Sequence, residues 1–246
     1  MLTLFKGPAG WGLGDVSPFV LKVMVWLDLK GEPYRTELGD PRKAPKGKVP
    51  WIRDADGTVI SDSSDILEHL RATRGALDGD AVMPCHVGVG HLVRRTLEES
   101  YAFALSWARW DPDENVPAMQ EVFRPILPPV ISGVVLRRVI RPGARRAGWA
   151  QGLFRHTAAQ VTARAAEDLR AVSDALGDRP YFCGDAPGAV DCTAWSFIAQ
   201  TFAQRLAVDP IRAFALNDPR LIAYHDRMLP RLPTAAPGVR PISPAA

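Results

Sequence analysis

Strand and helix signals divide this sequence into two unlike parts, and this division constrains the fold more than any other feature. Residues 1–6 alternate as a short strand, and residues 17–31 predict a helix that begins at a Ser-Pro pair and ends at Gly31. Segments 33–38, 49–54 and 58–62 have strand patterns, and an Asp-Gly turn joins the last two. With a second capped helix up to Gly75, this part predicts the order β-α-β-β-β-α.

Helical patterns dominate from residue 84 onward. They cover 85–109, roughly 116–140, 151–176, 188–206 and 218–228. Strands in one part and helices in the other favour an α/β unit followed by an all-α unit. We expect an α/β domain over 1–76, a linker over 77–84 and a helical bundle over 85–232. The Pro/Ala-rich residues 233–246 have little to bury, so we expect a disordered tail.

Composition is that of an ordinary globular protein. The 246 residues are 47% hydrophobic and 23% charged. No apolar run reaches about 18 residues and the start lacks a secretory-signal pattern, so we expect no membrane-spanning helix and no signal peptide. The three cysteines, Cys85, Cys183 and Cys192, are widely spaced and odd in number, which favours a reducing cytoplasm. No metal-ligand motif occurs, so we expect no metal site.

Positive charge is concentrated in one place. The chain has a net charge of +3, and five arginines fall within ten residues: Arg137, Arg138, Arg141, Arg145 and Arg146. The simplest interpretation is a solvated helix face. An anionic ligand, nucleic acid or a membrane surface are the alternatives, and of these we expect no nucleic-acid partner.

A proline lies inside the third predicted strand, in the segment GKVPWI. Proline donates no ladder hydrogen bond, so it belongs at a strand edge, a strand start or a bulge. A cis Val49–Pro50 bond would turn the Val49 N–H and C=O outward, where an extended peptide could pair with them. An ordinary trans proline at an edge is the alternative.

The wider context resembles a known superfamily. The segments SPFVLKVMVWLDLKGEPYRTEL, KAPKGKVPWI and GTVISDSSDILEHL are spaced as in the thioredoxin-like half of glutathione S-transferases, and GDRPYFCGDAPGAVDCTAWSFIAQ resembles their second-domain signature. Together with EESYAFALSWARW and RHTAAQV, they resemble the metaxin-like and failed-axon-connections-like branch over about residues 1–230. The resemblance implies a cis bond at Pro50 and glutathione as co-substrate.

The resemblance also implies a glutathione site. Val49 would pair with the cysteinyl backbone of the tripeptide. Ser63 would bind the γ-glutamyl carboxylate at a helix N-terminus, where anions bind well, and Asp62 would take the α-ammonium. For this pair, simple N-capping is the alternative, and both roles can coexist. Lys48 could reach the glycyl carboxylate, or it could be a solvated loop lysine.

Ser17 would be the catalytic residue. The chain has S-P-F-V where related redox proteins carry C-P-F-C or C-P-F-A, so a serine hydroxyl takes the thiol-activating position. Lowering a thiol pKa from about 8.5 to about 6.5 needs about 2.7 kcal/mol. A hydrogen bond to a charged group supplies about 1.5–3 kcal/mol, and a helix N-terminus about 0.3–1 kcal/mol. The two together are just sufficient. The alternative is that Ser17 only caps the helix.

Further residues could line a substrate pocket. The glycine-rich loop 7–16 is longer than in typical transferases and carries Trp11, which could stack on a ligand or pack in the loop. Tyr101, Arg109 and Trp110 lie on one predicted helix, and core packing is the alternative for the aromatic pair. Asp191 matches the family's acid that caps a buried helix, although Gly188 replaces the usual hydroxyl residue. We expect its loss to cost about 1–2 kcal/mol of stability.

Three functions are compatible with these residues. The first is a cytoplasmic glutathione transferase that conjugates an apolar electrophile. The second is a non-catalytic metaxin-like protein that serves interaction or ligand binding. The third is a glutathione-dependent isomerase or dehalogenase. Many relatives are two-fold dimers, which suggests a homodimer.

Overall fold

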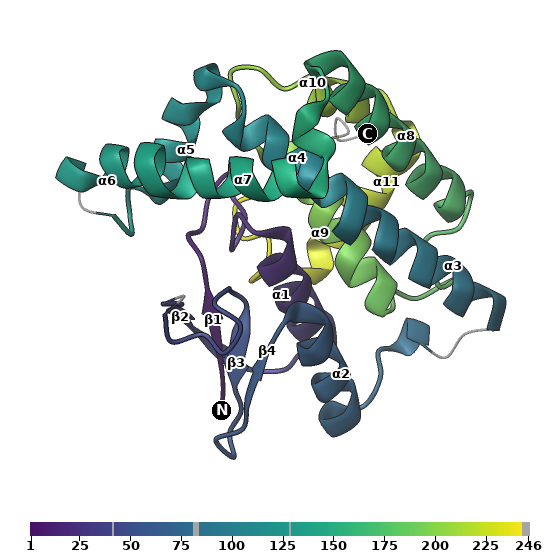
Figure 1. Cartoon of the computed structure of the whole chain (residues 1–246). Coiled ribbons are helices and arrows are strands. Elements are labelled where there is room, and N and C mark those ends of the chain that lie inside the picture. Colours follow the sequence, from purple (N-terminus) through teal and green to yellow (C-terminus); the bar gives the residue numbers. More distant parts are fainter. Residues whose placement is uncertain (41, 81–83, 128, 243–246) are drawn as a thin grey trace.

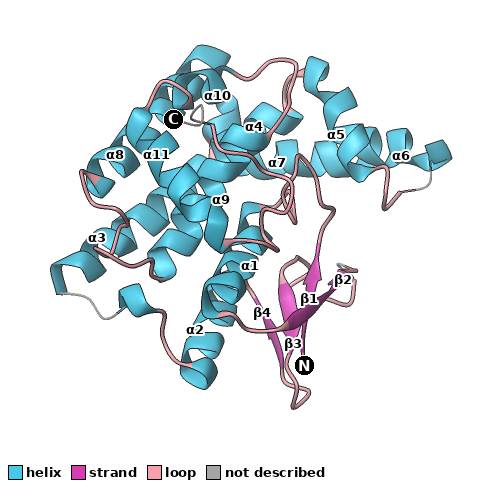
Figure 2. Ribbon diagram, turned by 180° about the vertical axis from the view of Figure 1, so that it is seen from behind, coloured by secondary structure: helices cyan, strands magenta, loops and turns pink. Residues whose placement is uncertain are grey.

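The computed structural model describes residues 1–40, 42–80, 84–127 and 129–242, and its first part is a small sheet with two helices (Figure 1). The elements are β1 (Leu2–Lys6), α1 (Pro18–Lys30), β2 (Tyr34–Leu38), β3 (Trp51–Arg53), β4 (Val59–Ser61) and α2 (Ser63–Arg74). In the sheet order β2-β1-β3-β4, β1 runs parallel to β2 and antiparallel to β3, which pairs with β4 as a hairpin. The predicted β-α-β-β-β-α order is confirmed. Both helices lie on the same side of the sheet (Figure 2).

Helix α1 has the expected signals at both ends. Ser17 precedes it in extended conformation, Pro18 is its first residue, and Gly31 ends it with a left-handed φ of 67°. Apolar residues surround this helix, and Trp26 is fully buried. It packs against α9 (Ala189–Ala203), which is buried along nearly its whole length, so the two helices join both parts of the chain in one core (Figure 1).

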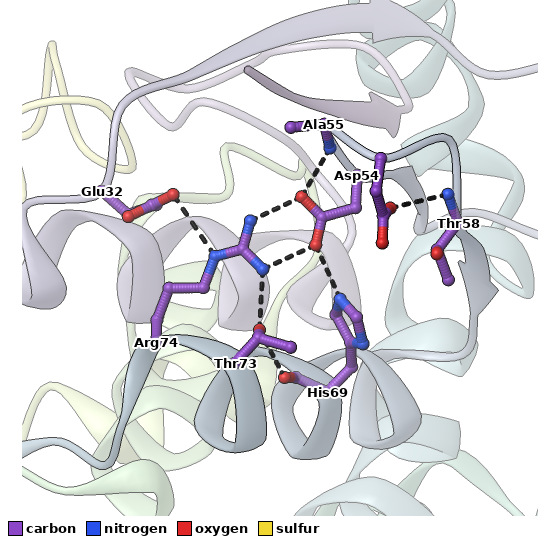
Figure 3. Close-up of polar contacts among 8 residues, drawn as sticks. Glu32, Asp54, Ala55, Thr58, His69, Thr73 and Arg74 are labelled. Atoms are coloured by element: carbon purple, nitrogen blue, oxygen red, sulfur yellow. Dashed lines mark hydrogen bonds and ion pairs between the residues drawn. The ribbon is translucent and has the colours of Figure 1, made fainter.

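Asp54 ties the β3–β4 turn to the end of α2 (Figure 3). Its carboxylate accepts two hydrogen bonds from the Arg74 guanidinium, at 2.5 and 2.6 Å, and contacts His69 Nε2 at 2.7 Å. Arg74 also contacts Glu32, which follows α1. The Arg74 hydrogen bonds, and then that of His69, hold the pKa of Asp54 well below its ordinary value. This network fixes the hairpin against α2, the helix that begins at the predicted glutathione site.

Helices make up the second part. They are α3 (Pro84–Arg95), α4 (Ala102–Trp110), α5 (Val116–Phe123), α6 (Pro129–Val135), α7 (Arg141–Gln151), α8 (Ala158–Leu176), α9, α10 (Pro210–Ala215) and α11 (Pro219–Met228). Short 3₁₀ turns cover Asp78–Asp80, Asp113–Asn115, Leu153–Arg155 and Leu229–Arg231. The π-helical segments Thr96–Tyr101 and Leu136–Ile140 join α3 to α4 and α6 to α7.

Two predicted helices in this part were wrong in extent, and one short helix was missed. The expected helix 116–140 is interrupted after Phe123, because Pro125 has no N–H to continue the backbone hydrogen bonds of the helix. The expected helix 151–176 begins only at Ala158, because Gly152 ends α7 with a φ of 114° and Thr157 forms a capping box with Gln160. The short helix α10 was missed, although Asp209 and Pro210 are an ordinary start signal.

The prediction of a disordered tail was wrong as far as Ile242; residues 243–246 lie outside the described residues. Ala235 is fully buried, and its carbonyl accepts from the Gly14 N–H at 2.8 Å. The Gly238 N–H donates to the Gly12 carbonyl at 2.9 Å, and Asp28 accepts from the Ala235 N–H at 2.7 Å. These backbone bonds need no apolar side chains, so composition could not reveal them. No helix in the described part of the chain is long and apolar enough to cross a membrane.

Candidate active site

The Val49–Pro50 peptide bond is cis, as the resemblance implied. Val49 is half-buried and packs against the sheet, and the neighbouring Gly39 has no room for a Cβ beside it. No described residue forms a hydrogen bond with the Val49 N–H or C=O. The main chain at Val49 is therefore free to pair with a ligand that has peptide character.

Ser17 lies at the start of α1, and no described residue forms a hydrogen bond with its hydroxyl. Its backbone N–H donates to Asp15 Oδ1 at 2.7 Å, while its side chain makes no cap hydrogen bond. The alternative that Ser17 merely caps the helix through its side chain is therefore not supported. The hydroxyl remains available to a group placed at the helix N-terminus.

Asp15 is a site residue that sequence reasoning missed. It is fully buried, and burial raises the pKa of its carboxyl from 3.8 to about 7 despite the opposing Ser17 N–H and the Lys6 ammonium at 4.0 Å. Its Oδ2 atom has no hydrogen-bond partner among the described residues. The available signal was an acidic residue in an otherwise apolar glycine-rich loop, two positions before Ser17.

Asp62 and Ser63 occupy the N-terminus of α2. Asp62 has a φ of 90°, which is rare outside glycine, and its Oδ1 accepts from the Ser64 N–H at 2.8 Å. Asp62 thus caps the helix, as the alternative predicted, and it remains exposed. Ser63 is 4% exposed. Lys48 is exposed, and Lys46, two positions before it, forms an ion pair with Asp65.

Two adjoining cavities bring these residues together. An apolar cavity of about 470 Å³ is lined by Ser17, Val49 and Gly7, together with side chains of the helical part. A polar cavity of about 590 Å³ is lined by Lys48, Asp62 and Ser63. Both cavities are lined by Phe19, Ala102 and Ser106, so they adjoin each other, and we call the two together the cleft. Ser17 lines its apolar half. Pro50 itself is buried and lines neither cavity.

The helical part contributes two of the predicted pocket residues. Trp110 and Arg109 both line the apolar cavity. Arg109 is 6% exposed, and its guanidinium donates to the Val16 carbonyl and to Gln200 Oε1, both at 2.7 Å. Gln200 in turn donates to the Asp15 carbonyl at 2.7 Å. Burial lowers the pKa of Arg109 to about 10, so it remains charged at neutral pH. Arg109 therefore holds the loop that leads into Ser17.

The other two predicted pocket residues lie elsewhere. Tyr101 is fully buried, and its hydroxyl is 2.6 Å from Thr201 Oγ1, so it belongs to the core. Trp11 has a φ of 56° and its ring lies 5.1 Å from the Arg109 guanidinium, but it is not among the residues that line the cleft. Tyr101 thus packs in the core, and the half-buried Trp11 packs against Arg109, as the alternative interpretation held.

A buried ion pair between the two parts of the chain was also missed. Lys22 of α1 is 1% exposed and donates to Glu98 Oε1 at 2.6 Å and to Ser64 Oγ at 3.0 Å. Glu98 lies in the π-helical segment and lines the polar cavity. The lysine inside the apolar run VLKVMVWL was the signal that could have revealed it.

Comparisons with known proteins agree with this arrangement. The Glutathione S-transferase N-terminal domain matches residues 18–115, and the Glutathione S-transferase, C-terminal domain matches residues 165–228. This chain belongs to the glutathione S-transferase superfamily. The order of a small sheet domain and a helical domain is therefore the glutathione S-transferase fold.

Individual relatives show which proteins of the superfamily this chain is similar to. An isoprene-epoxide–glutathione S-transferase from Rhodococcus sp. (strain AD45) is 28% identical over 93% of this chain and 98% of its own. Metaxin-1 from Macaca fascicularis is 25% identical over 93% of this chain and 74% of its own. A glutathione S-transferase structure from Methylobacterium radiotolerans, in complex with glutathione sulfonate, has a TM-score of 0.61 at 18% identity and covers 100% and 99% of the two chains. The chain is thus in the metaxin-like branch of the superfamily.

Proposed function

We propose that this protein is a cytoplasmic glutathione transferase of serine type. The observation that carries the proposal is the Ser17 hydroxyl, which no described residue engages, at the N-terminus of α1 in the apolar cavity that adjoins the polar one. A thiol placed there would have a hydrogen-bond donor on one side and an apolar reaction partner on the other.

Glutathione would lie along the polar cavity with its cysteinyl group beside Val49. The free Val49 N–H and C=O would pair with the tripeptide backbone, and Ser63 would bind the γ-glutamyl carboxylate at the N-terminus of α2. Asp62 uses Oδ1 for capping, so Oδ2 is left for the α-ammonium. Lys48 lines the same cavity and would bind the glycyl carboxylate.

Ser17 would then stabilise the thiolate through its hydroxyl, because its N–H already donates to Asp15. The thiolate would attack an electrophilic carbon of a small apolar molecule in the cavity of about 470 Å³. The name of the Rhodococcus relative makes an epoxide the first electrophile to test. In that reaction the C–S bond forms, the epoxide C–O bond breaks, and the alkoxide takes a proton from water.

Two other functions use the same cleft. Similarity to metaxin-1 supports a protein that keeps the fold for interaction, without turnover. An isomerase or dehalogenase would use the same thiolate on another substrate. We also propose a homodimer, in line with many proteins of the superfamily.

Calorimetry with glutathione, followed by titration of the bound thiol, tests the proposal. We expect a thiol pKa of about 6.5 in the complex, which the Ser17→Ala variant raises by about 1–2 units because one charged hydrogen bond is lost. Ser106→Ala is the matched control, since it removes a hydroxyl that lines both cavities away from the helix N-terminus. Absence of glutathione binding would favour the interaction protein. Binding with the same thiol pKa in the Ser17→Ala variant would remove Ser17 from the mechanism.

A further inference from the structure

One long helical segment carries a surface that the glutathione cleft does not use. Helix α6, the π-helical segment Leu136–Ile140 and α7 together span 129–151. The α6 end extends beyond the rest of the helical part in both views (Figures 1 and 2). We call the described residues of 131–151 that are open to solvent the outer face of this segment.

The charge around this segment is strongly one-sided. Residues 122–166 contain eight arginines and no aspartate or glutamate. Because the whole chain has a net charge of only +3, the rest of it is net negative. A sequence in which acidic residues are absent over 45 positions concentrates positive potential on one part of the surface.

The arginines of the predicted basic cluster divide into two groups. Arg141 pairs with Asp113 at 2.5 Å and Arg145 with Asp111 at 3.1 Å, so these two hold α7 against the end of α4. Arg137, Arg138 and Arg146 are exposed, and no described residue forms an ion pair with them. The second group therefore belongs to the outer face.

Large apolar side chains lie on the same face. Val134 is 56% exposed, Val139 62% and Trp149 57%, and Ile131 is also exposed. These are four of the nine large hydrophobic side chains that are exposed in the described part of the chain. Unpaired arginines mixed with exposed valine, isoleucine and tryptophan are typical of a helix that lies in a membrane interface.

A hollow beside the outer face offers room for a headgroup. It has a volume of about 590 Å³ and lies between α5 and the segment 129–151. Arg137, Arg138 and Arg124 line it, although Arg124 also pairs with Glu121. Arginine side chains in such a hollow can form paired hydrogen bonds with a phosphate group.

We propose that the outer face of the segment 129–151 docks this protein on the surface of an anionic lipid bilayer. The unpaired arginines bind lipid phosphates, while Val134, Val139 and Trp149 enter the interface between headgroups and acyl chains. A nucleic acid would match the arginines but leave the apolar side chains in water, so the bilayer uses more of the face.

Docking would also bring the cleft close to the bilayer. Ile140 of the same segment lines the apolar cavity, and Ala144 and Ala147 of α7 line the polar one. One side of the segment thus forms a wall of the cleft while the other faces the lipid. An apolar electrophile dissolved in the membrane would then lie near Ser17. That benefit rests on the proposed transferase function, whereas the docking itself is independent of it.

Vesicle sedimentation tests the docking. The full chain is mixed with phosphatidylcholine vesicles, with or without phosphatidylserine, at low and high salt. We expect binding only to the anionic vesicles, and weaker binding as salt rises. The triple variant R137Q/R138Q/R146Q should bind about 100-fold more weakly, while R71Q/R205Q/R240Q, which removes the same charge from exposed sites elsewhere, should bind within about threefold of the wild type.

A second variant separates a bilayer from any polyanion. V134S/V139S/W149S keeps every arginine, and we expect it to lose vesicle binding at least about tenfold because the apolar contacts are removed. Equal loss in both arginine variants, no binding to anionic vesicles, or unchanged binding by the serine variant would each overturn the proposal. Tighter binding to DNA than to vesicles would assign the face to nucleic acid instead. Glutathione calorimetry on the same variants keeps this result separate from the test of the transferase.

Discussion

Asp191 offers a test of how a buried carboxylate stabilises this fold. Its side chain is fully buried at the start of α9, where Oδ1 accepts from the Phe182 N–H and the Tyr224 hydroxyl at 3.0 Å. Oδ2 accepts from the Gly188 N–H at 2.9 Å. As expected from Gly188, only the acid's half of a capping box is present, but Asp191 satisfies two further donors that the sequence did not reveal.

The Asp191→Ala variant should therefore cost more than the loss of a helix cap. It leaves the backbone N–H groups of Phe182 and Gly188 buried without an acceptor, whereas the Tyr224 hydroxyl keeps the Asp191 carbonyl at 3.3 Å. Each buried donor without a partner costs about 1–3 kcal/mol, so we expect a loss of about 4 kcal/mol at pH 7. A cap alone would cost about 1–2 kcal/mol.

The pH dependence gives an independent check. Burial, opposed by the hydrogen bonds from Gly188 and Phe182, raises the pKa of Asp191 from 3.8 to about 6. Because the folded state binds this proton more tightly than the unfolded state, the carboxyl stabilises the fold more at low pH, and this gain is lost as the pH rises through 6. Between pH 7 and pH 5 the wild type should gain about 1 kcal/mol relative to Asp191→Asn, which cannot titrate.

Urea denaturation at pH 7 and pH 5 measures both effects. Asp174→Ala is the control, because Asp174 is an exposed acid on α8 whose ion pair with Arg220 should contribute less than about 1 kcal/mol. Asp15 titrates near pH 7 in both the wild type and Asp191→Asn, so its contribution cancels. A loss below 2 kcal/mol in Asp191→Ala, or a gap between wild type and Asp191→Asn that does not change with pH, would refute the reasoning.

Two further changes probe the framework around the cleft. Asp54→Asn should cost about 2 kcal/mol of stability at neutral pH, because Arg74 and His69 lose their carboxylate partner. The folded-state pKa of Asp54 lies below 3.8, so the stability difference between wild type and variant should shrink as the pH falls below that value. Urea denaturation over an acid pH series measures this, and a difference that stays constant would contradict the prediction. Truncation after Leu232 removes the backbone hydrogen bonds to Gly12 and Gly14, so the free energy of unfolding should fall by roughly 2–4 kcal/mol. Calorimetry should also show weaker binding of glutathione. Unchanged stability and affinity would show that residues 233–242 do not hold the loop before Ser17.

Local sequence signals were sufficient to predict the site residues that lie at the starts of helices. Ser17 before Pro18, and Asp62 before Ser63, mark helix starts within a few residues, and the resemblance supplied the cis bond at Val49. The interdomain contacts could not be predicted in the same way. Arg109 and Val16 are 93 positions apart in sequence, and Lys22 and Glu98 are 76 apart, so no local pattern relates them.

Helical spacing was sufficient for the stretch of helix that ends at Trp110. Tyr101 and Trp110 are nine positions apart, about two and a half turns, so one faces the core while the other lines the cleft. Tyr101 shares its buried face with Ala104, Leu105 and Ala108, as the spacing predicted. The core-packing alternative, and not a place in the pocket, therefore accounts for Tyr101.

By itself the sequence determined the order of elements as far as α2, the superfamily and the residues that open α1 and α2, because caps, turns and strand alternation act within a few positions of the chain. Only the tertiary structure decided which side chains line the cleft, that residues 233–242 hold the glycine-rich loop, and that Asp15, Arg109 and Gln200 form one network behind Ser17. Those contacts depend on how α1 packs against α9, and packing between distant segments is set by the shape of the whole core.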